Sequence, residues 1–265
     1  MEIVFDKLHG LGNDYIYVDI DRFPIEDLEG FAREFSPRRT GIGGDGLITY
    51  NKEASGGYLM RIFNLDGSEG LMCGNAIRCV AKLLYERGLC QDNPMTINTR
   101  SGEKILVLTI EDGKVTHARV DMGLPNVLED SKQVDEVEGV SVSVGNPHYI
   151  HFIAEDPDAY ALDTIGPRIE KHAAFPDGVN YEVAQMLDRH TIKMRVWERG
   201  SGLTMACGTG ATATAVAAIY KGLVDSPVKV MMPGGDLTID WSGNETKSVF
   251  MTGSATYVFQ GKVTI

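Results

Sequence analysis

Met72-Cys73-Gly74-Asn75-Ala76-Ile77-Arg78-Cys79 has a partner later in the chain, Ala206-Cys207-Gly208-Thr209-Gly210-Ala211. Each stretch follows a strand-like segment and begins a helix-like one, so each places a cysteine at a strand–turn–helix junction. The offset between the two stretches also aligns further pairs without a gap: Arg61 with Arg195, Phe63 with Trp197, Ala81 with Ala215, Gly88 with Gly222 and Leu89 with Leu223. This pattern predicts two copies of one structural unit.

The composition is that of an ordinary globular protein. The chain has 265 residues, of which 43% are hydrophobic and 23% charged, and this length suits one large domain or two ordinary ones. The formal net charge is −12, and lysine and arginine do not gather in any segment. These features argue against a nucleic-acid partner and against an anionic membrane as partner.

Two further features bear on location and on metal binding. No apolar run approaches the roughly 20 residues of a membrane-spanning helix, and residues 1–10 lack the basic and apolar regions of a signal peptide, so we expect a cytoplasmic protein. The four cysteines are too few for a disulfide framework. No Cys-x-x-Cys pair and no cysteine–histidine spacing predicts a zinc site.

Each copy is predicted to consist of many short strands with one longer helix near the middle. A sheet wrapped around a helix would bury it, and residues 211–219, which are small and apolar on nearly all sides, fit this geometry. The helix predicted at residues 75–87 fits it less well, because it carries Arg78, Lys82 and Glu86. The acidic segment 129–138 is predicted to be a surface loop.

The segment Gly41–Gly46 matches the pattern G-x-G-x-x-G. A dinucleotide-binding fingerprint requires a strand before this pattern and a helix after it. Here a polar segment, residues 36–40, precedes it and a strand-like segment, residues 47–50, follows. We therefore interpret it as a glycine-rich turn that leads into a strand.

A cysteine at the start of a helix has a distinctive environment. It lies beside backbone N–H groups that lack helical partners and at the positive end of the helix dipole, and both are expected to lower a thiol pKa from about 8.5. The same N–H groups can bind a carboxylate, and a glycine after the cysteine lets a ligand approach the backbone closely. Each copy therefore offers a reactive sulfur and an anion site.

Two such thiols suit the inversion of a stereocentre next to a carboxylate. Inversion needs a base on one face of the carbon and an acid on the other, and two similar thiols can exchange these roles. The alternative is that the cysteines are small buried hydrophobic residues, which is our interpretation of Cys79 and Cys90. The repeat and the flanking glycines favour the functional interpretation for Cys73 and Cys207.

Other polar residues at turns and strand ends have two possible interpretations. An asparagine at a turn commonly serves only to form the turn, and His148 could be a structural histidine. Glu198 and Arg199 could form a surface ion pair of little energetic weight. Their position on the strand that leads to Cys207 nevertheless favours a role in a site.

At the level of motifs, the chain resembles the diaminopimelate epimerase family. The motifs run the length of the chain in the family's order and are together highly specific: His9–Asp14, Phe63–Glu69, Met72–Asn75, Gly145–His148, Val179-Asn180, Trp197–Gly202, Ala206–Gly210 and Pro233–Gly235. The resemblance implies an α+β fold of two pseudo-symmetric domains, each a β-barrel wrapped around a central α-helix, with the active site in the interdomain cleft. The N-terminal half would be residues 1–119 with a closing strand at 254–265, and the C-terminal half residues 120–253.

The resemblance also implies a reaction, the interconversion of LL- and meso-2,6-diaminopimelate for lysine and peptidoglycan biosynthesis, without pyridoxal phosphate and without a metal. Cys73 and Cys207 would be the acid/base pair, assisted by His148 and Glu198. The distal end of the substrate would be held by Asn13, Asn64, Asn146, Asn180, Glu198 and Arg199. The reacting carboxylate would be held by Gly74, Asn75, Gly208 and Thr209. Diaminopimelate is the expected partner, and we expect a homodimer.

Two positions depart from the family pattern, and two alternatives remain. Gly46 stands where some members carry a side-chain amide that touches substrate, and Leu203 stands where the family usually has glutamate. One alternative is a related racemase of proline, hydroxyproline or another single amino acid, although proline racemases typically have histidine where this chain has Asn75. The other is a protein that binds an amino acid without turning it over, which would not exchange the substrate α-hydrogen with solvent.

Overall fold

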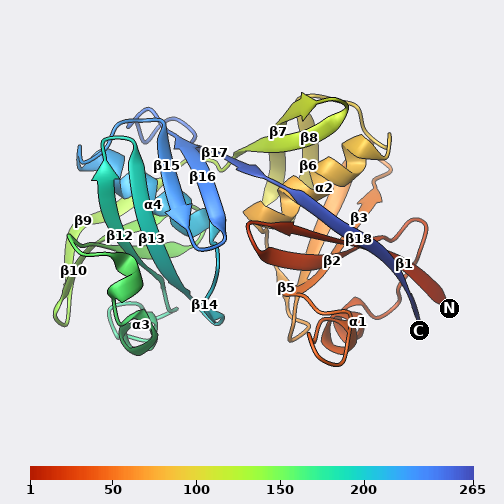
Figure 1. Cartoon of the computed structure of the whole chain (residues 1–265), viewed down its shortest axis with the longest axis horizontal. Helices are drawn as coiled ribbons and strands as arrows, with labels where there is room; N and C mark the ends of the chain where they lie inside the picture. Colours follow the sequence, from red (N-terminus) through yellow and green to blue (C-terminus); the bar gives the residue numbers. More distant parts are fainter. The chain divides into compact units, whose positions relative to one another are not determined.

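The computed structural model describes all 265 residues, and the chain divides into two compact units. Unit 1 comprises Met1–Val120 and Gly253–Ile265, and unit 2 comprises Asp121–Thr252. The chain leaves unit 1 at the end of strand β8 and returns to it within strand β17. Both units contain strands and helices. Figure 1 colours these elements by their position in the sequence.

Unit 1 contains two helices, α1 (Leu28–Phe35) and α2 (Gly74–Glu86). Its strands are β1 (Glu2–Gly10), β2 (Asn13–Asp19), β3 (Gly46–Lys52), β4 (Tyr58–Asn64), β5 (Glu69–Gly70), β6 (Met95–Thr99), β7 (Gly102–Glu111), β8 (Lys114–Asp121) and β18 (Thr256–Thr264). They pair in the order β18–β1–β2–β3–β4–β6–β7–β8. The pairs β2–β3 and β4–β6 are parallel and the others antiparallel, while the short β5 pairs with the end of β4.

Unit 2 contains α3 (Leu162–Glu170), α4 (Gly208–Tyr220) and a short 3-10 helix, η1 (Pro157–Ala159). Its strands are β9 (Asn126–Val134), β10 (Val137–Ser143), β11 (Pro147–Phe152), β12 (Asn180–Asp188), β13 (Thr191–Glu198), β14 (Gly202–Leu203), β15 (Val228–Met232), β16 (Gly235–Asp240) and β17 (Phe250–Ser254). The order β9–β10–β11–β12–β13–β15–β16–β17, parallel at β11–β12 and β13–β15, matches that of unit 1 strand for strand. In this match β9 corresponds to β18, which comes last in the chain.

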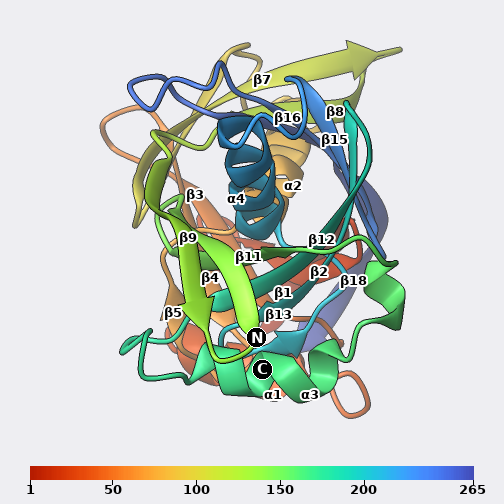
Figure 2. The same cartoon turned by 90° about the vertical axis from the view of Figure 1, so that its left-hand side faces the viewer.

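Helix α4 is the central element of unit 2. It contacts β9, β10, β11, β12, β13, β15 and β16, and Figure 2 shows strands on several sides of it. Its sequence, GTGATATAVAAIY, consists largely of small side chains, which let the strands approach closely, and nearly all of the helix is buried. The prediction of a buried helix at residues 211–219 is confirmed.

Helix α2 contacts β1, β2, β6 and β7 and is also buried, from Gly74 to Leu84. The prediction that α2 fits among strands less well than α4 agrees with the smaller number of strands that it contacts, although its charged residues do not keep it at the surface. Arg78 is fully buried and donates to the backbone oxygens of Ser254 and Gly74 at 3.1 and 2.9 Å. Lys82 donates to Glu86 and to the backbone oxygen of Val115. Burial is tolerated because these charges have hydrogen-bond partners.

Three further features can be compared with the predictions from the sequence. The glycine-rich segment is a turn that leads into β3, as predicted. The acidic segment 129–138 is not a loop: it forms most of β9 and the start of β10, which pair as a hairpin whose apolar residues Val134 and Val137 are buried. No helix is long and apolar enough to cross a membrane.

Candidate active site

Cys73 begins helix α2 in unit 1, at the N-cap position that the sequence predicts. Its Sγ lies 3.4 Å from Oδ1 of Asn13, which is positioned to accept a hydrogen bond from the thiol. The same oxygen accepts a hydrogen bond from Nδ2 of Asn75, at 3.2 Å. The turn between β1 and β2 therefore brings Asn13 to the start of α2. Gly10, just before this turn, has no room for a Cβ, which would lie 2.9 Å from Cβ of Asn75.

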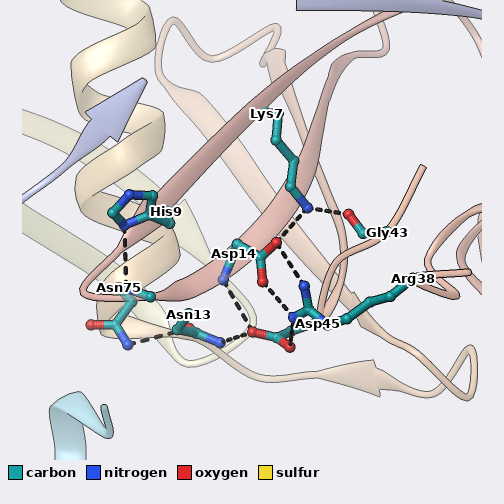
Figure 3. Close-up of polar contacts among 9 residues, drawn as sticks. Lys7, His9, Asn13, Asp14, Arg38, Gly43, Asp45 and Asn75 are labelled. Carbon is teal, nitrogen blue, oxygen red and sulfur yellow. Dashed lines mark hydrogen bonds and ion pairs between the residues drawn. The ribbon is translucent and has the colours of Figure 1, made fainter. Parts of the chain in front are cut away.

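An ion-pair network fixes the other side of Asn13 (Figure 3). Its Nδ2 donates to Oδ2 of Asp45 at 2.8 Å, and Oδ1 of Asp45 accepts from Arg38 at 2.8 Å. Arg38 also pairs with Asp14, which in turn pairs with the buried Lys7 at 2.6 Å. Although burial opposes ionisation, the hydrogen bonds from Arg38 and Lys7 prevail and lower the pKa of Asp14. Because Asp45 holds the amide nitrogen of Asn13, the amide oxygen faces Cys73.

Asn64 is the most exposed of the expected residues of unit 1. It ends strand β4, and its Nδ2 donates to Oγ of Ser68 at 3.0 Å within the turn that leads to β5. Gly74 and Asn75 form the first turn of α2, whose N–H groups have no carbonyl four residues before them in the helix.

Cys207 begins helix α4 in unit 2 and is 5% exposed. Its Sγ accepts a hydrogen bond from the backbone N–H of Gly210 at 3.3 Å and lies 3.5 Å from Oγ1 of Thr209. Glu198, at the end of β13, accepts a hydrogen bond from the hydroxyl of Thr204. Burial raises the pKa of Glu198 above its ordinary value.

The expectation of a lowered thiol pKa is wrong for Cys207. Burial raises the pKa of this thiol well above its usual value, and the negative charges of Glu198 and Glu182 raise it further. The hydrogen bonds from Thr209 and from the N–H of Gly210 act in the opposite direction but are outweighed. The start of the helix does favour the thiolate, but the loss of solvation and two carboxylates oppose it more strongly.

His148 is joined to the first turn of α4 by a chain of hydrogen bonds. The residue is 1% exposed, and its Nε2 lies 3.0 Å from Oδ1 of Asn146. Nδ2 of Asn146 lies 3.3 Å from Oγ1 of Thr209, which is itself next to Cys207. Four residues expected in the site are therefore brought together within unit 2.

Asn180 and Arg199 form a second group in unit 2. The backbone N–H of Arg199 donates to Oδ1 of Asn180 at 3.0 Å, and Nδ2 of Asn180 donates to the backbone oxygen of Pro147 at 2.9 Å. The side chain of Arg199 is exposed, donates to the backbone oxygen of Asp177 and lines a pocket of about 400 Å³. The side chain of Asn180 thus links the ends of β11, β12 and β13 by hydrogen bonds, so its amide stabilises the local structure.

Three carboxylates that support these residues were not predicted from the sequence. Asp45 orients Asn13, as described above. Glu170, at the end of α3, accepts from Nε1 of Trp197 at 2.6 Å and from the N–H of Gly200 at 3.0 Å, and so fixes the turn that carries Arg199. Glu182, in β12, lies 2.7 Å from Nδ1 of His148. The sequence offered one signal for these three carboxylates, which is that they lie beside glycine-rich turns or within buried strands.

Comparison with known proteins assigns the fold. The structure resembles a phenazine biosynthesis protein of the PhzF family from Bacillus anthracis, with a TM-score of 0.78, 17% identity and full coverage of both chains. It also resembles a hydroxyproline epimerase from Agrobacterium vitis, with a TM-score of 0.72 and 15% identity over 99% of this chain and 91% of the other. The chain therefore has the mixed α/β fold of the class that includes these epimerases and PhzF-type proteins.

Sequence comparison assigns the family. The family model for diaminopimelate epimerase matches residues 5–128 and 140–258. A diaminopimelate epimerase from Bacteroides thetaiotaomicron is 50% identical over 264 residues, 99% of this chain and 98% of that protein. The chain belongs to the diaminopimelate epimerase family, a family of isomerases, and the resemblance stated from the sequence is confirmed.

The raised pKa of Glu198 leads to a test of stability. A group whose pKa is raised on folding stabilises the fold below its unfolded pKa, and this stability is lost as pH rises through the folded pKa. Glu198→Gln should therefore unfold at a higher urea concentration than the wild type at about pH 8. The difference should vanish as pH falls below about 4.3, the ordinary glutamate pKa.

Urea denaturation at a series of pH values measures this difference. Glu138→Gln, at an exposed position on β10, is the matched control and should leave the profile unchanged. A Glu198→Gln protein that is less stable than the wild type at the higher pH would contradict the assigned direction of the shift.

Proposed function

We propose that this chain interconverts LL- and meso-2,6-diaminopimelate by removing the α-proton with one cysteine and returning a proton with the other. Membership of the family supports this substrate. The observation that carries the mechanism is the recurrence, in both units, of a cysteine at the start of a buried helix. We assign the reaction to lysine and peptidoglycan biosynthesis.

The two thiols are proposed to begin the reaction in different states. A thiol with a raised pKa is suited to donate a proton, so we assign Cys207 the acid role towards the bound substrate. Cys73 would then take the α-proton as thiolate, and the roles would exchange in the reverse direction. The N–H groups of Gly74, Asn75, Gly208 and Thr209 would bind the reacting carboxylate and stabilise the negative charge that develops on it.

The unreactive end of the substrate carries a second amino and carboxylate group, and each needs a partner. We assign the carboxylate to Arg199, whose guanidinium can bind it in a fork. Asn13, Asn64, Asn146, Asn180 and Glu198 complete the proposed set. His148 and Glu198 would assist the thiols, and the burial of His148 and the raised pKa of Glu198 support this role.

We propose that the strands of each unit close into a barrel around its helix, with halves at residues 1–119 plus 254–265 and at residues 120–253. The matching strand orders of the two units support this arrangement. The reaction as proposed requires both halves to contribute to one site. We also propose the cytoplasm as its location, since four free cysteines suit a reducing compartment.

The protein is further proposed to form a homodimer through β18. This strand pairs only with β1 among the recorded pairs of unit 1, and three consecutive apolar residues on it are exposed: Tyr257, Val258 and Phe259, at 42, 51 and 44%. The proposed barrel of unit 1 would therefore be open at β18, and an exposed apolar edge of this kind favours pairing with a second copy of the same chain.

The acid/base pair can be tested by substitution. Cys73→Ala and Cys207→Ala should each lower turnover of LL-diaminopimelate by a factor of about 10³ or more, because each removes the group on one face of the α-carbon. Cys79→Ala and Cys90→Ala are the controls and should retain activity. The measurement is epimerisation in D₂O with deuterium followed at the α-carbon. Near wild-type turnover in either of the first two variants would exclude the two-thiol mechanism.

The second prediction concerns substrate choice. A site whose polar groups are covered when the substrate binds rejects an analogue that leaves them unpaired, often by about 10⁴ or more in kcat/KM. Proline and alanine should therefore be very poor substrates compared with diaminopimelate. Arg199→Lys should lower kcat/KM for diaminopimelate strongly despite its retained charge, because the fork is lost. Similar kcat/KM values for proline and diaminopimelate in the wild type would favour the racemase alternative.

The dimer has its own test. Val258→Lys places a charge on the exposed edge of β18, and sedimentation at micromolar concentration should show a shift from dimer to monomer. Ser242→Lys, which adds the same charge at an exposed position in unit 2, controls for a general change of surface charge. Identical sedimentation of wild type and Val258→Lys would rule out this edge as the contact.

A further inference from the structure

Glu182 is a buried carboxylate that has no role in the proposed reaction. It lies in the middle of the buried part of β12 and is 0% exposed. One oxygen, Oε1, lies 2.7 Å from Nδ1 of His148, and the other, Oε2, is buried without a hydrogen-bond partner. Burying a carboxylate costs free energy, and an unsatisfied oxygen adds to that cost. A position that needed only packing would be served better by an apolar side chain.

The carboxylate also lies against the first turn of α4. A Cβ at Gly210 would be 2.7 Å from Oε1 of Glu182 and 3.2 Å from Sγ of Cys207. The carboxylate and the sulfur are therefore close neighbours of the same backbone position, and only glycine leaves room for both. The N-terminal end of a helix carries a partial positive charge, which favours an anion at this place.

Glu182 also ends the hydrogen-bond chain described above. The imidazole of His148 is held at both nitrogens, by Glu182 at Nδ1 and by Asn146 at Nε2, 3.0 Å away. Its ring cannot rotate without breaking both contacts. The chain continues from Asn146 to Thr209 and ends beside Cys207.

We propose that Glu182 is a positioning residue of the active site, which fixes the His148 ring and places a negative charge beside Cys207, against the first turn of α4. This inference rests on the proposed function, in which Cys207 begins as the acid and His148 assists. The recorded contact of Glu182 is with His148, so in this proposal it acts through this residue and through its charge.

The charged and titratable groups around Cys207 determine in which direction a change at Glu182 moves the pKa of this thiol. Glu198 on β13 and Glu182 on β12 raise its thiol pKa, while Thr209 and the N–H of Gly210 on α4 lower it. His148 on β11 faces Glu182 and is paired with it. Replacing Glu182 by glutamine removes one of the two negative charges and keeps the shape of the side chain. The pKa of Cys207 should therefore fall in Glu182→Gln.

The test is the pH dependence of alkylation by iodoacetamide, followed at Cys207 by peptide mass spectrometry in the full chain. The midpoint for Cys207 should move to lower pH in Glu182→Gln. A shift of one pH unit corresponds to an about tenfold faster reaction at pH values below the midpoint. Cys90, which lies in unit 1 outside the site, is the internal control and should react equally in both proteins.

Activity supplies a second readout. The alkaline limb of the kcat/KM profile for diaminopimelate should move to lower pH in Glu182→Gln, because Cys207 loses its proton earlier. Glu138→Gln, at an exposed position in the same unit, should leave both profiles unchanged. Glu182→Asp, which keeps the charge, should restore the Cys207 midpoint to near the wild-type value.

Two results would overturn the proposal. One is a folded Glu182→Gln protein with an unchanged Cys207 midpoint, which would make Glu182 only a structural partner of His148. The other applies if Glu182→Gln does not fold: Glu182→Asp then decides, and a clearly lowered midpoint with the charge retained would contradict the electrostatic role. A wild-type protein that does not epimerise diaminopimelate would refute the proposed function but would leave the alkylation result standing.

Discussion

Each unit of this protein buries the beginning of a helix among strands, and the chemistry of the site depends on that constraint. The first N–H groups of a helix have no partner within it, and burial normally requires that such groups be satisfied. At α4 the sulfur of Cys207 satisfies one of them, that of Gly210. Other groups of the first turn can serve a bound carboxylate. In the proposed function, a chain with a net charge of −12 thus takes its anion site from its backbone.

The two cysteines share this location but not the same surroundings. Cys73 faces a neutral amide, Asn13, whose orientation is fixed by Asp45 on its far side. Cys207 faces carboxylates on two strands and is buried more deeply. Two copies of one fold thus present similar sulfurs in unlike electrostatic environments. For a reaction that needs one acid and one base, unlike environments in the resting protein are an advantage.

Much of this arrangement could be predicted from the sequence because it depends on local pattern. The strand–turn–helix junctions, the positions of Cys73 and Cys207 and the turn before β3 follow from apolar periodicity and glycine placement, and the structure confirms them. Features that depend on partners distant in the chain could not be predicted. The burial of Arg78 is one of them, because its acceptor, the carbonyl of Ser254, lies 176 positions away.

The same reasoning explains why two predictions, those for segment 129–138 and for the thiol pKa of Cys207, were wrong. Segment 129–138 is acidic, yet it forms a hairpin because Val134 and Val137 pack into the core. The many charged residues around these two valines make this apolar pattern hard to recognise in the sequence. The raised thiol pKa of Cys207 was not predicted because its main cause is burial, and because Glu182, 25 positions before Cys207, gives no sign in the sequence of lying beside α4. In both cases the competing interaction comes from packing, which local pattern does not reveal.

The place of β18 in the chain affects how the protein is made on the ribosome. Unit 2 is continuous in sequence, whereas unit 1 lacks both its outermost strand and the carbonyl partner of Arg78 until residues beyond 252 have been synthesised. Domains commonly fold in the order of their synthesis. Here unit 1 is the first to leave the ribosome, but it gains its last strand, β18, only after unit 2 has been synthesised. The edge of β1 that pairs with β18 is therefore exposed in the nascent chain while unit 2 is being translated.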